Sequence, residues 1–142
     1  VEDLARLPED QLMKLWQGLG YYNPARNLQA AARQIMAEYS GVFPSDYDRI
    51  RALKGVGDYT AGAICSIAFG QPRAAVDGNV LRVVARLTGD GSDIAAQATK
   101  RKVAQALEQV IPIQAPGRFT QAMMDLGAMV CLPGKGGRGS FR

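Results

Sequence analysis

The stretch LKGVGDYTA, residues 53–61, decides how the fold of this chain is interpreted. It lies between two runs of helical periodicity and places two glycines on either side of one valine. Glycine adopts positive φ without steric cost, so Gly55 and Gly57 together allow a very tight turn. Asp58 follows directly and is a favoured residue at the start of a helix. The stretch therefore predicts two helices joined by a sharp hairpin.

The same turn predicts a site for phosphate. In such a hairpin the N–H groups of the turn and the start of the next helix point outward together, and the helix dipole favours an anion there. Contacts to phosphate fix the position of a protein on DNA and read no sequence. We therefore expect Lys54, Gly55, Val56 and Gly57 to contact DNA, and the turn carbonyls on the other side could hold a monovalent cation. The pattern alone also fits a turn that needs glycine only for its geometry.

The composition is that of an ordinary globular protein with a net positive charge. The 142 residues are 47% hydrophobic and 21% charged, with a net charge of +4 and a pI of about 9.3. Such a chain is long enough for one domain with a core, and its charge favours an anionic partner, nucleic acid first. Its apolar runs are too short to span a bilayer, and no signal-peptide pattern opens it. We expect no membrane partner and a cytoplasmic, nucleoid-associated protein of bacterial type.

The residue types present exclude several kinds of chemistry. The sequence has no histidine and two cysteines, Cys65 and Cys131. Ser-His-Asp catalysis and imidazole-bound zinc are therefore excluded, and one chain cannot supply four thiolates to a metal. Two cysteines could form one disulfide, but the composition favours a reduced pair, with Cys65 as a small hydrophobic residue in a buried helix.

Helical periodicity and capping residues predict an all-α fold without alternating β runs. Ser45 with Asp48 resembles a capping box, while Asp58 and Asp77 are expected to cap the helices that follow them. The helix after Asp58 is apolar almost all round, so we expect it to be central and buried. The expected helices cover residues 1–6, 9–18, a run from an Asn23-Pro24 start to Gly41, 47–53, 59–69, 78–87, 94 or 95 to 110, and 116 or 117 to 130.

The sequence predicts one domain over residues 1–132 and a flexible, basic, glycine-rich tail over residues 133–142. The chain begins with valine instead of methionine, so we expect a fragment or a processed product.

Three further segments accompany the hairpin: WQGLGYYNPARNL (16–28), VDGNVLRV (76–83) and RFTQAMMDLGAMVC (118–131). In order and spacing they resemble the helix-hairpin-helix DNA glycosylases, and specifically the adenine DNA glycosylases of the MutY type. The resemblance covers nearly the whole chain up to Cys131. It implies the helix-hairpin-helix glycosylase fold: a six-helix barrel core without its first helices, plus part of the cluster-domain helices. It also implies a base excision repair hydrolase that removes adenine mispaired with 8-oxoguanine or guanine in double-stranded DNA.

Tyr59 distinguishes this subfamily from the endonuclease III branch. In that branch a lysine at this place attacks the sugar and forms a Schiff base, which enables strand cleavage. A phenol cannot form an imine, so the resemblance implies a monofunctional glycosylase that leaves the strand intact. The alternative is that Tyr59 is a half-buried helix residue without a chemical role.

The resemblance assigns Asp77 to the chemistry. Breaking an N-glycosidic bond builds positive charge on the sugar, and a preorganised carboxylate stabilises such a cation. The family places its stabilising aspartate at this position, and Asn79 would lie close enough to help position it. An aspartate before Gly-Asn is also a common helix N-cap, which is the alternative and a second duty that the same residue could perform.

The remaining residues that the resemblance assigns act on DNA. The target adenine must leave the stack, and Tyr21, with Leu19 nearby, would wedge into the duplex to replace the lost stacking. Arg26 is assigned to the DNA-binding set, and the amide of Gln121 would pair with N6 and N7 of the extruded adenine. The alternatives are that Tyr21 is a core aromatic, as we expect of Trp16, and that Gln121 is a solvent-facing glutamine.

Some features of the family have no counterpart in the sequence. The general-acid glutamate of the family lies on a helix before Val1, so we expect this polypeptide not to excise adenine by itself. Cys131 matches the first of four ligands of a [4Fe-4S] cluster, but no further thiolate follows, so no cofactor is expected here. Loss of the leading helix is also expected to leave an apolar groove that favours self-association.

Two other functional hypotheses remain open from the sequence. One is a noncatalytic helix-hairpin-helix module, which would bind duplex DNA with strong salt dependence and no preference for a mispair. The other is an endonuclease III-like lyase, which borohydride trapping would reveal and which Tyr59 disfavours.

Overall fold

The computed structural model describes residues 1–134, and within them the chain forms eight α-helices, a π-helical segment and no strand. The prediction of an all-helical fold is confirmed. Most of the predicted flexible tail, residues 135–142, lies outside the described residues. In residues 1–134 no helix combines the length and the apolar character that a bilayer crossing requires. The chain divides into a first unit, Val1–Ala61, and a second unit, Gly62–Arg142, which are described separately below.

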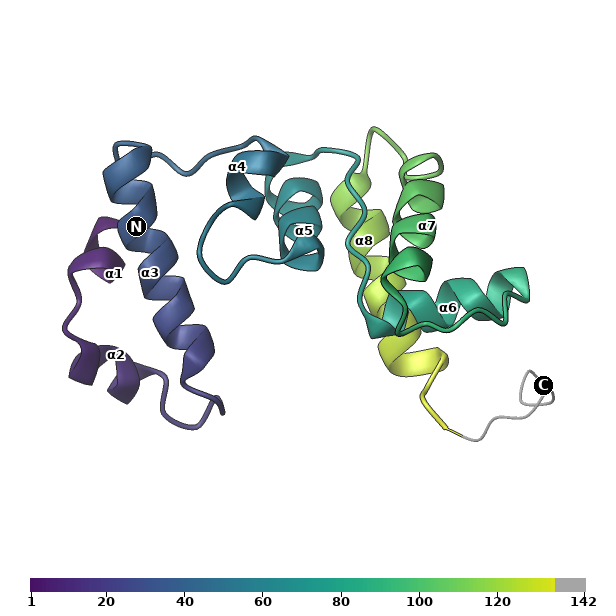
Figure 1. Ribbon diagram of the computed structural model, residues 1–142, viewed down its shortest axis with the longest axis horizontal. Helices are drawn as coiled ribbons and strands as arrows, with labels where there is room; N and C mark the ends of the chain where they lie inside the picture. Colours follow the sequence, from purple (N-terminus) through teal and green to yellow (C-terminus); the bar gives the residue numbers. More distant parts are fainter. Residues whose placement is uncertain (135–142) are drawn as a thin grey trace. The chain divides into compact units, whose positions relative to one another are not determined.

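The first unit is built on one long helix. Its helices are α1 (Glu2–Arg6), α2 (Glu9–Leu15), α3 (Asn23–Glu38), α4 (Tyr47–Arg51) and the start of α5 (Asp58–Phe69). The short helix α1 lies against α3 (Figure 1). The buried amide of Gln29 in α3 donates to the carbonyl groups of Leu4 and Leu7 at 3.2 and 2.6 Å. This side chain therefore satisfies carbonyl groups at the end of α1 and holds that helix on α3.

The core of the first unit connects α3 to the hairpin. Ala31, Ile35 and Leu53 form a buried cluster, against which Tyr39 and Val56 pack. Because Leu53 and Val56 belong to the turn itself, burial of their side chains orients the hairpin on α3.

Three predicted helix starts in the first unit are wrong in detail. Helix α5 contains Asp58 as its first residue, so Asp58 does not stand before the helix as the predicted cap. The N-cap of α4 is Asp46, whose carboxylate accepts from the N–H groups of Asp48 and Arg49, in place of the expected capping box that begins at Ser45. Asn23 is the first residue of α3 and Tyr22 occupies the N-cap position, so Asn23 does not cap the helix. A one-residue shift of this kind is easily missed, since several polar residues in a row can all serve as caps.

The second unit packs two helices and a π-helical segment against α6 (Gly78–Thr88). Helix α6 contacts α7 (Gln97–Glu108), α8 (Pro116–Asp125) and η1 (Leu126–Val130) (Figure 1). The predicted cap at Asp77 and the predicted end at Gly89, which has a φ of 66°, are both confirmed. The buried core residues are Ala74, Val80, Leu81, Val103, Leu107 and Ile111.

Close backbone contacts hold the C-terminal half of α5 in the second unit. A Cβ on Gly62 would lie 2.0 Å from the carbonyl oxygen of Ala74, so no side chain fits there. On the next turn of α5, the buried hydroxyl of Ser66 accepts a hydrogen bond from the buried hydroxyl of Thr120 in α8, at 2.9 Å. The expectation that α5 is central and buried is wrong at its C-terminal end, where Ile67 is 46% exposed and Phe69 is 37% exposed.

The last two helices differ from their predicted bounds. The helix expected from residue 94 or 95 begins at Gln97, and the helix expected to run to residue 130 becomes π-helical at Leu126. Gly127, in the π-helical segment, packs so closely on α6 that a Cβ would lie 2.5 Å from the Cβ of Asn79. The wider π-helical turn occurs where the chain makes this close contact, and π-helical turns are frequent at functional sites.

We predict that Gly62→Ala destabilises the chain by about 1–3 kcal/mol or more, because the added methyl group meets a backbone oxygen that cannot rotate away. The higher helix propensity of alanine recovers only about 1 kcal/mol of this cost. Urea denaturation measures the difference. The matched control is Gly91→Ala, which meets no atom within 4 Å and should change stability by less than about 0.5 kcal/mol. Equal stability of the two variants would show that the close contact at Gly62 does not exist.

A second prediction concerns the loop between α6 and α7. Ser92 donates to the carboxylate of Asp90 through its hydroxyl and its N–H group, and Lys102 Nζ lies 3.0 Å from the same carboxylate. These partners, with the Ser92 hydroxyl first, hold the pKa of Asp90 well below its usual range. A lowered carboxyl pKa adds stability that is complete above the unfolded-state pKa and is lost as the pH falls through the folded-state pKa.

The stability difference between the chain and its Asp90→Asn variant should therefore be largest near neutral pH and shrink below about pH 4. Thermal melts of both proteins across this range give the comparison. A gap that stays constant down to about pH 3 would contradict the role of the Asp90 charge.

Candidate functional site

The hairpin that the sequence predicted is held in place by α3. The N–H group of Lys54 donates to the Oε1 atom of Gln34 at 3.0 Å. Gly55 has a φ of 77°, and a Cβ there would lie 2.5 Å from the Cβ of Asn27. Gly55 is therefore required twice, once by its backbone conformation and once by the close approach of α3.

Arg51 fixes the other side of the turn. Its Nη1 atom donates to the carbonyl oxygen of Val56 at 2.8 Å, and its Nε atom pairs with the carboxylate of Asp58. The hydrogen bond to Asp58, followed by the charge of Asp58, raises the pKa of the Arg51 guanidinium. Arg51 thus bridges the residues before and after the turn. The predicted monovalent cation stays a prediction, and at the carbonyl of Val56 it would share the oxygen with this guanidinium.

The free backbone donors of the turn are fewer than the sequence suggested. The N–H group of Val56 bonds to the carbonyl of Leu53 at 3.1 Å, and that of Lys54 is taken by Gln34. Among residues 1–134 the structure shows no acceptor for the N–H groups of Gly55 and Gly57. A Cβ on Gly57 would meet no atom within 4 Å, so this side of the turn is open. The backbone of the two glycines is therefore available to a phosphate, and the Val56 side chain belongs to the core.

The loop between α2 and α3 presents aromatic and apolar side chains to solvent. Leu19 is 69% exposed and Tyr21 is 89% exposed, so the alternative that Tyr21 is a core aromatic is wrong. Gly18 and Gly20 have φ values of 88° and 93°, which shape the loop around Leu19. Trp16 is partly buried, and its Nε1 atom donates to the carbonyl of Tyr21 at 3.1 Å. The indole thus supports the backbone that carries the exposed phenol.

Arg26, which we expected among the DNA contacts, already has an acidic partner. Its Nε atom lies 2.8 Å from Oε1 of Glu9, and both side chains are mostly exposed. A phosphate would have to compete with this carboxylate, but exposed ion pairs contribute only about 0–1 kcal/mol. Arg26 could exchange Glu9 for a phosphate at a small cost in free energy, so its role in DNA binding stays a prediction.

Asp77 in the second unit uses both carboxylate oxygens locally. The Oδ1 atom accepts from the N–H group of Val80 at 2.8 Å and so caps α6. The Oδ2 atom accepts from the side-chain amide of Asn79 at 3.1 Å. An ionised carboxylate can accept about four hydrogen bonds, and the Asp77 side chain is only partly buried, so it can still face a cation.

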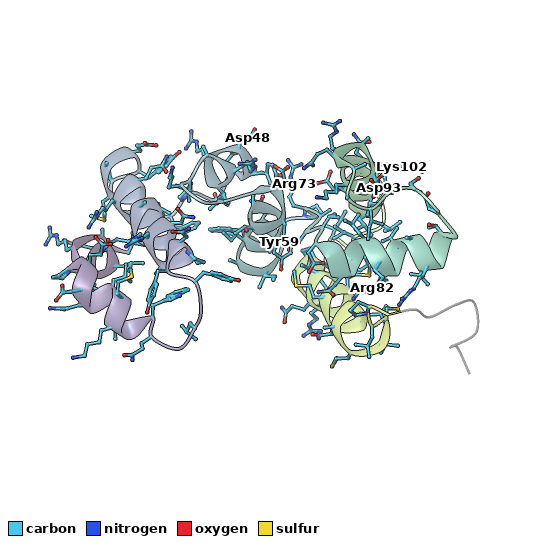
Figure 2. All side chains as sticks on the ribbon, turned by 60° about the horizontal axis from the view of Figure 1, so that its bottom comes forward. Asp48, Tyr59, Arg73, Arg82, Asp93 and Lys102 are labelled. Carbon is cyan, nitrogen blue, oxygen red and sulfur yellow. The ribbon has the colours of Figure 1, made fainter. Side chains whose placement is uncertain are left out.

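Asn79 is oriented by Arg82, a residue that sequence reasoning missed. The Nη2 atom of Arg82 donates to Oδ1 of Asn79 at 2.8 Å and to the carbonyl of Gly127 at 2.7 Å. Its Nε atom donates to the carbonyl of Cys131. Arg82 lies on the side of α6 that faces the C-terminal helical segment (Figure 2). The i,i+3 spacing of Asn79 and Arg82 was the available signal, but it is common on helices and does not single out this pair.

Asp77 also lines an open depression in the surface of the second unit. Its volume is about 310 Å³, and the only charged side chains in its lining are Asp77 and Lys100, the second of which sequence reasoning also missed. The remaining lining residues are Val76, Gly78, Leu81, Ile94 and Ala95. A carboxylate, an ammonium group and an apolar wall thus meet in one hollow of the second unit.

Tyr59, Gln121 and Cys131 are not among the residues that line this depression. Tyr59 is in the first turn of α5 (Figure 2), and Gln121 is an exposed residue of α8. Cys131 follows η1 and is buried, and its thiol is free.

The donor set does not fit the iron-sulfur cluster of the resembled family. A [4Fe-4S] cluster takes four cysteine thiolates, whereas the sequence has two cysteines, Cys65 in α5 and Cys131 after the end of η1. Within residues 1–134 no group of three or more potential metal ligands is close enough to hold an ion.

Comparison with known proteins defines the class. Residues 1–112 match the family described as "HhH-GPD superfamily base excision DNA repair protein". Because the match covers well over half of the chain, the chain belongs to this superfamily of DNA glycosylases. The predicted family and its helix-hairpin-helix fold are therefore confirmed.

The curated relatives narrow the comparison to adenine DNA glycosylases. The human enzyme is 42% identical over 134 residues, which are 94% of this chain and 24% of that protein. The enzyme of Buchnera aphidicola subsp. Acyrthosiphon pisum is 38% identical over 123 residues, 87% of this chain and 35% of that protein. The Arabidopsis thaliana enzyme is 40% identical over 125 residues, 88% of this chain and 20% of that protein. The chain thus spans 20% to 35% of the length of these relatives.

Solved structures show the same fold. A thermostable thymine-DNA glycosylase superposes with a TM-score of 0.81 at 31% sequence identity. The match covers 94% of this chain and 62% of the glycosylase chain. A non-covalent endonuclease III-DNA complex gives a TM-score of 0.76 at 32% identity, with 92% of this chain and 60% of that chain covered. The second structure contains DNA, in keeping with a family of DNA-binding glycosylases.

The two glycines of the hairpin should respond differently to alanine. Gly57→Ala leaves the fold intact, with a stability change below about 1 kcal/mol, but places a methyl group on the open face of the turn. It should weaken binding to a DNA duplex about 10- to 100-fold, since a hydrogen bond to a charged group contributes about 1.5–3 kcal/mol. Gly55→Ala should lower stability as well as binding, because its φ is positive and Asn27 blocks the Cβ.

Thermal melts and fluorescence-anisotropy titrations of the two variants give the comparison, with Gly91→Ala as the control. Unchanged duplex affinity in Gly57→Ala would show that phosphate does not approach this face.

Proposed function

We propose that this chain is part of an adenine DNA glycosylase, which hydrolyses the N-glycosidic bond of adenine mispaired with 8-oxoguanine or guanine. The observation that supports it most is the position of Asp77. Its carboxylate is held by Val80 and Asn79 at the edge of an open depression, where a sugar could approach it. The identity of about 40% to adenine DNA glycosylases over most of the chain supports the choice of base.

The chemistry proposed for Asp77 is electrostatic. As the bond between the adenine nitrogen and the sugar carbon breaks, its electron pair leaves with the base and positive charge develops on the sugar. A fixed carboxylate stabilises that charge without having to reorganise, which is the most effective form of electrostatic catalysis. Water then adds to the sugar carbon and loses a proton, which balances the proton that the departing adenine takes up. The hydrogen bond from Asn79 to Oδ2 holds the carboxylate in one orientation.

The exposed loop supports the extrusion of a base. Taking a base out of the duplex costs a few kcal/mol, and an aromatic side chain that stacks in its place offsets about 1–3 kcal/mol. Tyr21 is the most exposed of the large apolar residues in the described chain, and Leu19 precedes it by two positions. We assign these two residues to the wedge, and Gln121 to the recognition of the extruded adenine.

Tyr59 determines what happens to the DNA strand. The residue occupies the position at which the lyase branch carries its amine nucleophile, and a phenol cannot form a Schiff base with the sugar. We therefore propose a monofunctional enzyme, which releases the base and leaves the strand uncut.

A noncatalytic DNA-binding module is the second candidate. Gln34 and Arg51 shape the hairpin through hydrogen bonds that lie wholly within the first unit. Binding of a phosphate by the hairpin therefore does not require Asp77. A module of this kind would bind duplex DNA without regard to the state of any one nucleotide.

A sugar analogue that carries a positive charge separates the two candidates. One duplex contains a protonated pyrrolidine opposite 8-oxoguanine, and a matched duplex contains the neutral tetrahydrofuran. We expect the chain to prefer the cationic analogue, because transition-state analogues bind more tightly than neutral counterparts. Asp77→Asn should lose about 10- to 100-fold of this preference, as expected for a charge-assisted contact of about 1.5–3 kcal/mol.

Asparagine is as good an N-cap as aspartate, so the variant keeps the start of α6 and changes only the charge. The control Glu108→Gln makes the same charge change at the C-terminal end of α7, where Glu108 forms a weak ion pair with Arg73. This variant should keep the preference for the cationic analogue. Equal affinity of the unmodified chain for the two analogues would favour the noncatalytic module.

A further inference from the structure

Lys100 is one of several basic residues of the second unit without an acidic partner in the described part of the chain, and it is the one that lines the depression beside Asp77. Lys102 pairs with Asp90 at 3.0 Å and Arg73 with Glu108 at 3.7 Å. Among residues 1–134 the structure shows no hydrogen bond or ion pair for the ammonium group of Lys100, although the residue is partly buried. Partial burial removes hydration from an ammonium group, and here no protein group replaces it. An anion that arrives from outside would supply the missing partner.

The depression that Lys100 lines contains one other charged group, Asp77. The two charges form no ion pair with each other, so each can face a bound molecule. Between them Val76, Leu81 and Ile94 offer an apolar surface. The volume of about 310 Å³ is at the small end for ligand sites and is enough for a sugar with its phosphate.

We propose that Lys100 binds a phosphate that flanks the target nucleotide, and that this contact positions the sugar of that nucleotide against Asp77. The proposal rests on the function proposed above. A carboxylate close to a DNA strand repels the phosphates on both sides of its target sugar, and an ammonium group in the same hollow offsets that repulsion. Lys100 is thus a positioning residue: it contacts the backbone, and Asp77 contacts the sugar.

The first experiment measures the affinity of the 142-residue chain for a duplex with a tetrahydrofuran abasic-site analogue, at several salt concentrations. Lys100→Met should lower the affinity about tenfold at low salt and reduce the slope of log affinity against log salt by about one. Lys100→Arg should keep most of the affinity, because it keeps the charge. The matched control is Arg101→Met, an exposed cation on the same helix outside the depression, which should lose less affinity.

The second experiment removes the charge from the DNA. Neutral methylphosphonates replace, one at a time, the two phosphates that flank the abasic-site analogue. One of the two should weaken binding by the unmodified chain and cause no further loss in Lys100→Met, because the contact is already gone. A loss that persists in full in Lys100→Met would overturn the proposal and would assign Lys100 to charge balance around Asp77. Equal affinity of Lys100→Met and the unmodified chain would overturn it as well.

Lys100→Gln provides a second neutral variant for the same comparison if the methionine variant does not fold.

The two proposals fail separately, because the phosphate contact is measured with a neutral sugar analogue and the role of Asp77 with a cationic one. If the chain showed no preference for the cationic analogue, the proposed function would fail, while the methylphosphonate result would still decide whether Lys100 holds a phosphate.

Discussion

The carboxylate of Asp77 and the N–H group of Val80, 2.8 Å apart, form the contact on which the rest of the second unit depends. The bond starts α6, and α6 is the helix that α7, α8 and η1 all contact. The same bond leaves the second carboxylate oxygen beside Asn79 at the edge of the depression. Capping and proposed catalysis therefore do not compete. The cap fixes the orientation of a charged group that would otherwise rotate, and fixed orientation is what electrostatic stabilisation of a sugar cation requires.

Close backbone packing supplies the second constraint. Gly55, Gly62 and Gly127 each lie where a Cβ would come within 2.5 Å or less of a neighbouring atom. At Gly127 the contact brings η1 to Asn79, and Arg82 then joins the two through its guanidinium. Interiors packed at this density transmit small displacements, so a shift of the C-terminal segment would reach the Asp77 carboxylate through Asn79. The orientation of the proposed catalytic group is thus held by residues far along the chain.

Much of the fold follows from local rules that the sequence displays. The hairpin, the cap at Asp77 and the end of α6 at Gly89 were predicted because each depends on one residue and its immediate neighbours. The cap of α4 was assigned one residue early, since Ser45 and Asp46 are both good caps. Arg82, Lys100 and the partners of the hairpin N–H groups could not be predicted, because their roles depend on residues 20 to 49 positions away or on a cavity that exists only in the folded chain.

The central claim is that Asp77 stabilises a positive charge on the sugar of the target nucleotide. The most direct test is a crystal structure of the chain bound to a duplex that carries a protonated pyrrolidine at the target position. The account predicts that a carboxylate oxygen of Asp77 lies within about 4 Å of the ring nitrogen, the limit for an ion pair, while the cap on Val80 is kept. A pyrrolidine bound elsewhere on the chain, with Asp77 in contact only with Val80 and Asn79, would contradict the account.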